Sequence, residues 1–217
     1  MGRGVDTTMT MHALGGIDAP RPPLIQEGEL SINSFFHRTH VYYKMKSYLE
    51  IKVPISFDDY WFKELRDLLD GVDIRWQRGY YHITMAFLDY APDGVNLVPG
   101  LSHILDDAMA PTLTFDKLDA FASGYHRQVI HLTTTDAPAD FLALVEDARR
   151  YFKAKGCEIQ SDFKLHVTLG RVQDPRMNVR KLQDIIGQVD LPSFTMELTD
   201  VEYRIFRGKT LGLWKLR

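Results

Sequence analysis

Cysteine is nearly absent from this chain, and long apolar runs and an excess of positive charge are missing altogether. Its 217 residues include one cysteine, which excludes an intramolecular disulfide and a cysteine-rich zinc site and fits a reducing compartment. No apolar stretch approaches the roughly 20 residues that cross a membrane. The N-terminus also lacks the pattern of a signal peptide. We therefore expect a cytoplasmic protein without a membrane partner.

The charge balance limits the partners that the chain can have. Lysine and arginine number 26 against 29 acidic residues, so the formal net charge is -3. This excludes a broad cationic surface of the kind that drives tight duplex binding. Any contact with nucleic acid should be small and local. A hydrophobic content of 45% is enough for a real core in one domain or two small lobes.

The first 44 residues differ in composition from the remainder. They are rich in Gly, Pro and Thr, include the run Pro20-Arg21-Pro22-Pro23, and show little periodicity. Such a segment is predicted to be irregular. Met45 stands directly before the first regular strand pattern, so we assign residues 1–44 to an N-terminal extension and residues 45–217 to the functional domain.

One strand-helix-strand plan occurs twice in that domain. Residues 48–55 read as a strand, Ser56 to Asp59 can cap the following helix, and Gly71 ends it. The helix has a stripe of apolar residues at helical spacing: Trp61, Phe62, Leu65, Leu68 and Leu69. The plan recurs as a strand over 128–133 and a helix that ends at Gly156, with the stripe Phe141, Leu144, Val145, Ala148 and Phe152.

The rest of the domain supplies further elements. We expect helices near 101–109 and 179–189 and strands near 112–121, 195–206 and 210–216. The sequence therefore predicts an α+β fold with two lobes. Two antiparallel sheets should face a central cleft, with the helices on their outer sides.

Each copy of the plan ends in a His-x-Thr motif within an apolar run. The two strings are Tyr81-His82-Ile83-Thr84-Met85-Ala86-Phe87-Leu88 and Leu165-His166-Val167-Thr168-Leu169-Gly170-Arg171. Because alternate residues of a strand share a face, each string presents one imidazole and one hydroxyl together, opposite its apolar residues. If the two faces met across a cleft, they would form a phosphate site.

A third His-x-Thr complicates this pattern. His131 and Thr133 lie in the strand before the second helix, where His131 aligns with Lys52 of the first copy rather than with either motif histidine. Position therefore marks His131 as a bystander. It could still lie beside the cleft on a neighbouring strand.

Two imidazoles and two hydroxyls suit the cleavage of a phosphodiester. One histidine can accept a proton from the attacking oxygen, the other can protonate the leaving oxygen, and the hydroxyls can donate to the non-bridging oxygens. Threonine is a weak metal ligand and no acidic residue or cysteine completes either motif, so no metal or cofactor is expected. A lone histidine in a strand is usually only a satisfied polar group, but two copies at equivalent points of a repeat favour a paired site.

These motifs resemble the twin His-x-Thr/Ser motifs of the two-histidine (2H) phosphoesterase superfamily, which includes 2′-5′ RNA ligase-like proteins and cyclic phosphodiesterases. The resemblance covers about residues 45–217. It implies metal-independent action on 2′,3′-cyclic phosphates or 2′-5′ linkages of RNA ends or small nucleotides. It also implies that His82 and His166 are the acid and base and that Thr84 and Thr168 bind phosphate. The family often has a proline where this chain has Leu165, a departure on the core side.

Further substrate contacts are less constrained by the sequence. Tyr80 and Lys164 each lie two residues before a motif histidine and so share its face, where a ring could stack on a base and an ammonium could meet a phosphate. Strict alternation turns Arg171 away from the site unless the strand has ended by Gly170. Further candidates without geometric support are Tyr125, Arg127 and Phe206.

Two functions remain open on the sequence alone. The first is a cyclic phosphodiesterase or 2′-5′ RNA ligase-like enzyme. The second is a non-catalytic protein that binds RNA ends or nucleotides in the same cleft. In either case a monomer is expected.

Overall fold

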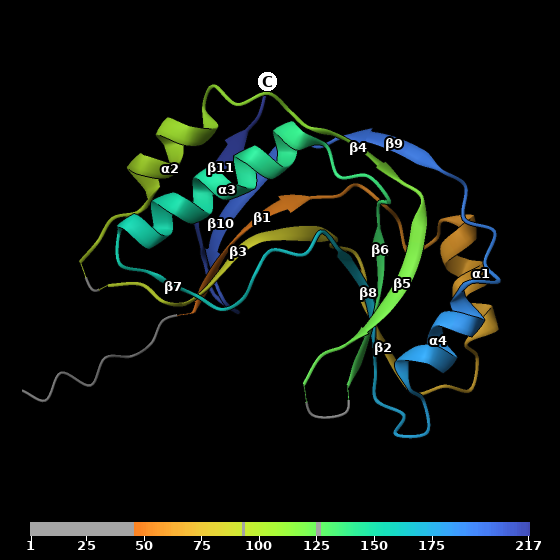
Figure 1. Ribbon diagram of the computed structural model, residues 1–217. Helices are drawn as coiled ribbons and strands as arrows, with labels where there is room; N and C mark the ends of the chain where they lie inside the picture. The colour runs from red at the N-terminus through yellow and green to blue at the C-terminus, as the bar shows by residue number, and fades with distance from the viewer. Residues whose placement is uncertain (1–45, 93, 125–126) are drawn as a thin grey trace, which may run out of the picture. The chain divides into compact units, whose positions relative to one another are not determined.

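The computed structural model describes residues 46–92, 94–124 and 127–217, so the predicted N-terminal extension and the predicted start at Met45 lie outside the described residues. The helices are α1 (Tyr60–Leu68), α2 (Val98–Leu105), α3 (Ala139–Ala154) and α4 (Val179–Ile186) (Figure 1). The strands are β1 (Ser47–Lys52), β2 (Ile74–Trp76), β3 (His82–Tyr90), β4 (Thr112–Phe115), β5 (Lys117–Ala122), β6 (Gln128–Thr133), β7 (Glu158–Ile159), β8 (Val167–Val172), β9 (Phe194–Glu197), β10 (Asp200–Ile205) and β11 (Thr210–Lys215).

Nine of these strands form one antiparallel sheet. Its order is β11-β10-β1-β3-β8-β6-β5, with β7 added to β3 and β2 added to β8, while β4 and β9 form a separate antiparallel pair. Strands β3 and β8 are joined only through the residue pair Ile83 and Val167. We call β11, β10, β1, β3 and β7 the first lobe, and β2, β8, β6 and β5 the second lobe.

The predicted α+β fold with antiparallel sheets is confirmed, and the strand-helix-strand plan is present twice. The two copies, β1-α1-β2-β3 and β6-α3-β7-β8, exchange parts in a symmetric way. Strand β2 of the first copy pairs with β8, and β7 of the second copy pairs with β3. Each lobe is therefore built from both copies, which the sequence pattern did not reveal.

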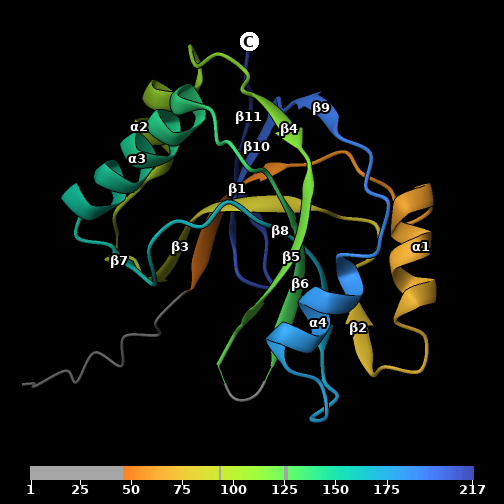
Figure 2. The ribbon, with the colours of Figure 1, turned by 45° about the vertical axis from the view of Figure 1, so that its right-hand side comes forward.

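The helices follow the same exchange. Helix α3 packs on β3 and β7 of the first lobe together with α2, whereas α1 contacts α4, which covers β5 of the second lobe. Both ribbon views show α2 with α3 and α1 with α4 as two separate pairs on the outer sides of the sheet (Figures 1 and 2). The helices thus leave the face between the lobes uncovered, because their apolar sides are used against the outer surfaces.

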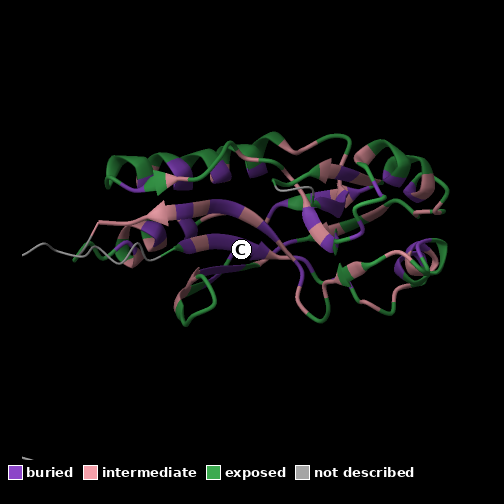
Figure 3. Ribbon diagram, turned by 90° about the horizontal axis from the view of Figure 1, so that it is seen from below, coloured by how far each residue is buried: buried purple, intermediate pink, exposed green. Residues whose placement is uncertain are grey.

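Burial follows the predicted apolar stripes with one exception. Trp61, Phe62 and Leu65 of α1 are buried, while Leu68, which was expected in the same stripe, is 40% exposed. Gly71 adopts a φ of 78° after the helix, a conformation that favours glycine. Seen from below, the buried residues run along the central strands and the helix faces that touch them (Figure 3).

No helix among the described residues is both long and apolar enough to cross a membrane.

The helix predicted near 101–109 begins earlier, at Val98, because Pro99 is compatible with the first turn of a helix, where its missing N–H is not needed.

Candidate active site

The single pair that joins β3 to β8 brings the two motifs together. Ile83 and Val167 are the middle residues of the two His-x-Thr motifs, and both are fully buried. Because neighbouring residues of a strand point to opposite faces, the motif histidines and threonines lie on the other face. All four are partly buried there, as expected for a shared site: His82, Thr84, His166 and Thr168.

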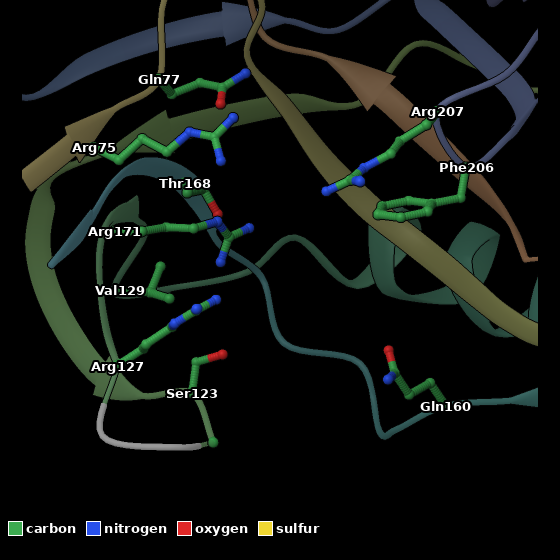
Figure 4. A pocket seen from close by; sticks show the side chains of 11 residues that line it. Arg75, Gln77, Ser123, Arg127, Val129, Gln160, Thr168, Arg171, Phe206 and Arg207 are labelled. Carbon is green, nitrogen blue, oxygen red and sulfur yellow. The ribbon is translucent and has the colours of Figure 1, made fainter. Parts of the chain in front are cut away.

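Antiparallel pairing also fixes which motif residues are neighbours. Around the pair Ile83–Val167, His82 lies toward Thr168 and Thr84 lies toward His166. Thr84 and His166 accordingly line one cavity of about 560 Å³. Thr168 lines an adjoining cavity of about 760 Å³, shown in Figure 4. Arg171 lines both cavities, so they adjoin, and we call the two together the groove.

The hydroxyl groups of Thr84 and Thr168 have no hydrogen-bond partner within the described part of the chain. A partly buried hydroxyl normally finds a partner in the protein or in water. Two unpartnered hydroxyls beside two imidazoles are therefore available to a ligand in the groove.

His166 is held in one tautomer. Its Nδ1–H donates a hydrogen bond of 2.8 Å to the main-chain carbonyl of Lys164, and since a carbonyl can only accept, the proton must be on Nδ1. The lone pair of the neutral ring is then on Nε2. Burial lowers the pKa of His166, which keeps the ring neutral and able to accept a proton.

His82 has a different environment, because its Nε2 lies 3.3 Å from the carboxyl group of Glu50. Glu50 is fully buried, and burial raises its pKa to about 7. Burial, followed by the nearby His166, lowers the pKa of His82 to about 4. Its Nδ1 is buried without a hydrogen-bond partner among the described residues. His82 does not line either cavity of the groove, so it lies at the edge of the site.

Tyr80 supports this pair and is not a free stacking surface. Its hydroxyl donates a hydrogen bond to the Glu50 carboxyl group and lies 3.5 Å from Glu202. Its ring centre is 5.3 Å from that of His82. The residues that line the groove do not include Tyr80, which faces a separate cavity with Lys52. Tyr80 therefore holds Glu50 against His82.

His131 lies close to the site, and its predicted alignment is wrong by two residues. In the sheet, His131 pairs with Thr168, and the equivalent partner of Thr84 is Glu50, not Lys52. The ring centre of His131 is 5.9 Å from that of His166. His131 therefore lies next to the second motif where Glu50 lies next to the first. The pairing of the strands aligns His131 with Glu50, whereas the sequence repeat had aligned it with Lys52.

Arg171 points into the groove because of a bulge in β8 that the sequence pattern did not reveal. Strand β8 continues past Gly170 to Val172, so the strand does not end where the prediction required. Instead, the register against β6 skips Leu169. This bulge reverses the alternation, so Arg171 shares the face of Thr168 rather than that of Leu169.

The first motif has the same bulge at the equivalent place. The register between β1 and β3 skips Met85, which turns Phe87 into the groove, five residues after His82 as Arg171 is five residues after His166. The Phe87 ring is stacked parallel to the Tyr48 ring, with the two ring centroids 6.0 Å apart. The centroid of the Phe87 ring lies 5.8 Å from that of the Phe206 ring. These three rings form an aromatic wall on the first lobe.

The wall on the second lobe is basic. Arg75, Arg127 and Arg171 point into the larger cavity, and Arg207 extends toward them from the opposite side (Figure 4). Lys164 lines the cavity that holds His166, with its Nζ 5.6 Å from the Phe121 ring. Of the substrate candidates named from the sequence, Lys164, Arg171, Arg127 and Phe206 face the groove, Tyr80 does not, and Tyr125 lies outside the described residues.

Sequence reasoning missed Glu50, Arg75 and Phe87. Phe87 could have been found by aligning the two motifs, since it matches Arg171. Arg75 could not, because it reaches the groove only through the exchange of β2 into the second lobe. As for metal ligands, no cluster of three or more histidine, cysteine or acidic side chains occurs among residues 46–92, 94–124 and 127–217.

Comparison with known proteins identifies the family of this chain. The sequence model of the 2′-5′ RNA ligase superfamily matches residues 57–210. The chain therefore belongs to that superfamily, the two-histidine phosphoesterases. Membership supports phosphodiesterase or RNA ligase-like enzyme activity in general. No curated protein matches the chain in sequence.

Solved structures share the fold at low sequence identity. E. coli LigT complexed with 3′-AMP is 19% identical with a TM-score of 0.50, covering 79% of this chain and 98% of its own. The protein TT0787 of Thermus thermophilus is 18% identical with a TM-score of 0.57, covering 80% and 98%. Kluyveromyces marxianus Usb1 with uridine monophosphate is 10% identical with a TM-score of 0.57, covering 80% and 99%.

Proposed function

We propose that this protein is a phosphodiesterase that acts on 2′,3′-cyclic phosphates or 2′-5′ linkages of RNA ends or small nucleotides by paired histidine acid-base catalysis. The observation that carries the proposal is the pairing of Ile83 with Val167, which gathers both His-x-Thr motifs on one face beside an open groove. The nucleotides in the structures of LigT and Usb1 support a nucleotide ligand.

His166 is the proposed general base. Its Nδ1–H is fixed by the Lys164 carbonyl, so Nε2 can take a proton from the attacking water while the water oxygen forms a bond to phosphorus. A neutral ring is needed for this step, and burial favours the neutral form by lowering the pKa of His166.

His82 and Glu50 together are the proposed proton donor. Below about pH 7 the Glu50 carboxyl group holds a proton beside His82, because burial raises the pKa of Glu50 to about 7. As the bond between phosphorus and the 2′ or 3′ oxygen breaks, the leaving oxygen takes a proton from His82, and Glu50 positions the ring. The negative charge of a bound phosphate raises the pKa of a neighbouring imidazole and so favours protonated His82 in the complex.

The two threonines are the proposed phosphate-binding groups. The hydroxyls of Thr84 and Thr168 lie next to opposite histidines and can donate to the non-bridging oxygens as charge develops there. The proposed mechanism uses neither a metal ion nor a cofactor, and the protein is proposed to act as a monomer in the cytoplasm.

The test is a hydrolysis assay of the purified protein in chelator. The substrates are 2′,3′-cyclic mononucleotides, 3′,5′-cyclic nucleotides and 2′-5′ oligonucleotides, with the position of the product phosphate read out. Turnover of the first or third class that persists in chelator supports the proposal, and abolition by chelator would overturn the metal-independent mechanism.

Replacing either catalytic histidine separates catalysis from binding. His82→Ala and His166→Ala should each lower kcat by about 10²- to 10⁴-fold, with a much smaller effect on nucleotide affinity. Thr84→Ala or Thr168→Ala should lower it by up to about 10²- to 10³-fold. If the wild type binds nucleotides but hydrolyses none of these substrates, the alternative of a non-catalytic RNA-end or nucleotide-binding protein is favoured.

A further inference from the structure

Helix α3 contributes a buried arginine that meets no acidic side chain. Arg149 is 7% exposed, and none of the ion pairs formed within residues 46–92, 94–124 and 127–217 includes it. A buried cation without a carboxylate partner costs folding stability. Arg149 also lines the cavity that holds Thr84 and His166. Residues that break a folding rule in this way are expected at functional sites.

The guanidinium group of Arg149 reaches two main-chain carbonyls. Its Nη2 donates to the carbonyl of Ser161 at 2.6 Å, and its Nη1 lies 3.5 Å from the carbonyl of Met85. Met85 is the bulged residue of β3 that turns Phe87 into the groove. Ser161 belongs to the segment that leads to His166. Arg149 therefore joins the strand of the first motif to the segment in front of the second motif.

The carbonyl of Met85 needs a side-chain donor because it lies in a gap of the sheet. Along β3, the pairing with β8 stops at Ile83 and the pairing with β7 starts at Leu88. In the second lobe the equivalent bulged residue is Leu169, and its carbonyl accepts a hydrogen bond of 2.8 Å from the main-chain N–H of Gln77. Buried carbonyls are nearly always paired in some such way. One half of the site is thus closed by the main chain and the other half by an arginine side chain.

The second motif needs an anchor because His166 does not lie in a strand. Strand β8 begins only at Val167, and residues 160–166 form neither helix nor strand. His82, by contrast, is the first residue of β3. The carbonyl that fixes the tautomer of His166 belongs to Lys164, within this irregular segment. A shift of the segment would therefore move that carbonyl away from the imidazole ring.

We propose that Arg149 is a positioning residue for the reaction. By holding Ser161 against the Met85 bulge, it fixes the two motifs relative to each other. It also keeps the Lys164 carbonyl in place, so that His166 retains the tautomer with its lone pair on Nε2. This rests on the proposed function, in which His166 is the base. A guanidinium group suits the task because its rigid fork of donors reaches two carbonyls at once.

The first test reads the tautomer of His166 by nitrogen NMR of the histidine rings in the full chain, with the signal assigned by its loss in His166→Gln. In the wild type Nδ1 should carry the proton. Arg149→Met keeps the apolar stem but has no donor, so its ring should exchange between both tautomers, and Arg149→Lys, which lacks the fork, should give an intermediate result. The matched control is Arg150→Met, which removes the same charge from a neighbouring side chain of α3 that is 69% exposed and should leave the tautomer unchanged.

The second test measures turnover of adenosine 2′,3′-cyclic phosphate by the same variants. A displaced base lowers the rate of the chemical step, so Arg149→Met should reduce kcat by about 10- to 100-fold. KM should change less, because Arg149 donates to main-chain carbonyls and not to the substrate. Arg150→Met should keep the wild-type kcat.

The outcomes distinguish positioning from a purely structural role and from a failure of the proposed function. An unchanged tautomer in Arg149→Met, or an unchanged kcat where the wild type is active, would overturn the proposal even if the variant unfolds more readily. If Arg149→Met does not fold, Arg149→Lys decides, since a mixed tautomer supports the proposal and a wild-type tautomer and kcat overturn it. If the wild type hydrolyses no substrate, the proposed function fails, and the tautomer of His166 alone decides whether Arg149 holds the segment.

Discussion

At the scale of single residues, the two halves of the site differ in the group that each histidine ring contacts. A main-chain carbonyl fixes His166, whereas His82 meets the carboxyl group of Glu50, which is held in turn by Tyr80. A carbonyl can only keep a proton on the ring nitrogen that faces it, but a carboxyl group can share one. The site is therefore chemically asymmetric although its motifs are alike.

This asymmetry predicts the effect of Glu50→Gln on the pH profile. As pH rises through about 7 the pair of Glu50 and His82 loses its proton, so wild-type kcat/KM should fall on the alkaline side from about that pH. Glu50→Gln removes the titrating carboxyl group, so we expect this limb to shift and kcat to decrease by about 10-fold or more. The measurement is kcat/KM between pH 5 and 9.

The control for this prediction is Glu202→Gln. Glu202 is also a buried carboxyl group near Tyr80. Its charge raises the pKa of both Glu50 and His82, but it makes no contact with His82, so Glu202→Gln should shift the alkaline limb less than Glu50→Gln. If both variants shift the alkaline limb equally, Glu50 has no special role as a positioning residue. Thermal unfolding of both variants separates a shifted pKa from a loss of fold.

At the scale of elements, two equivalent bulges decide what faces the groove. The bulge at Leu169 turns Arg171 inward, and the bulge at Met85 turns Phe87 inward. After each bulge comes a small residue, Gly170 in β8 and Ala86 in β3. The small size of Gly170 is required, since a Cβ there would lie 2.8 Å from the Trp76 ring and 2.9 Å from a methyl group of Ile74.

Gly170→Ala should therefore displace β2 from β8. The overlap involves two side chains of β2 at once, so we expect the free energy of unfolding to decrease by about 1 to 3 kcal/mol, as for overpacking in a core. Urea denaturation measures this. The displacement also moves Arg75, which pairs with Arg171 across the two strands. A variant with wild-type stability would show that β2 has room to adjust.

At the scale of the whole molecule, the partly buried His82 and the buried His131 make stability depend on pH. The pKa values of His82 and His131 are lowered to about 4, from about 6.5 in the unfolded chain. Between these values the unfolded state binds more protons, so stability rises as pH increases from about 4 to 6.5. Glu50, with its pKa raised to about 7, opposes this, because the folded state then holds a proton that the unfolded state has lost.

Two histidines outweigh one carboxyl group, so we expect a net rise of the order of 1 to 3 kcal/mol over this range. Urea unfolding at pH 4.5, 5.5 and 6.5 measures it. His131→Gln removes one of the two histidine contributions and should flatten the curve. A stability that falls over this range in the wild type would contradict the assigned burial of the histidines.

Removal of residues 1–44 is a second test at this scale. The composition of that segment predicts an extension without a catalytic part. A chain that begins at Met45 should fold and keep the activity of the full chain, as measured by circular dichroism and kcat/KM. Loss of either would show that the segment belongs to the functional domain.

The sequence by itself determined the motifs, the period of the strands and helices, and the repeat, because these depend on the spacing of apolar residues along a few turns or strands. From that spacing the α+β class and the common face of His82 with Thr84 and of His166 with Thr168 could be predicted. Spacing carries no information on which strands pair. Only the tertiary structure decided the exchange of β2 and β7 between the lobes, the two bulges, and hence the inward turn of Arg171 and Phe87 and the place of Arg75. The contact of Glu50 with His82 was decided in the same way, since sheet register is set by packing between segments far apart in the chain.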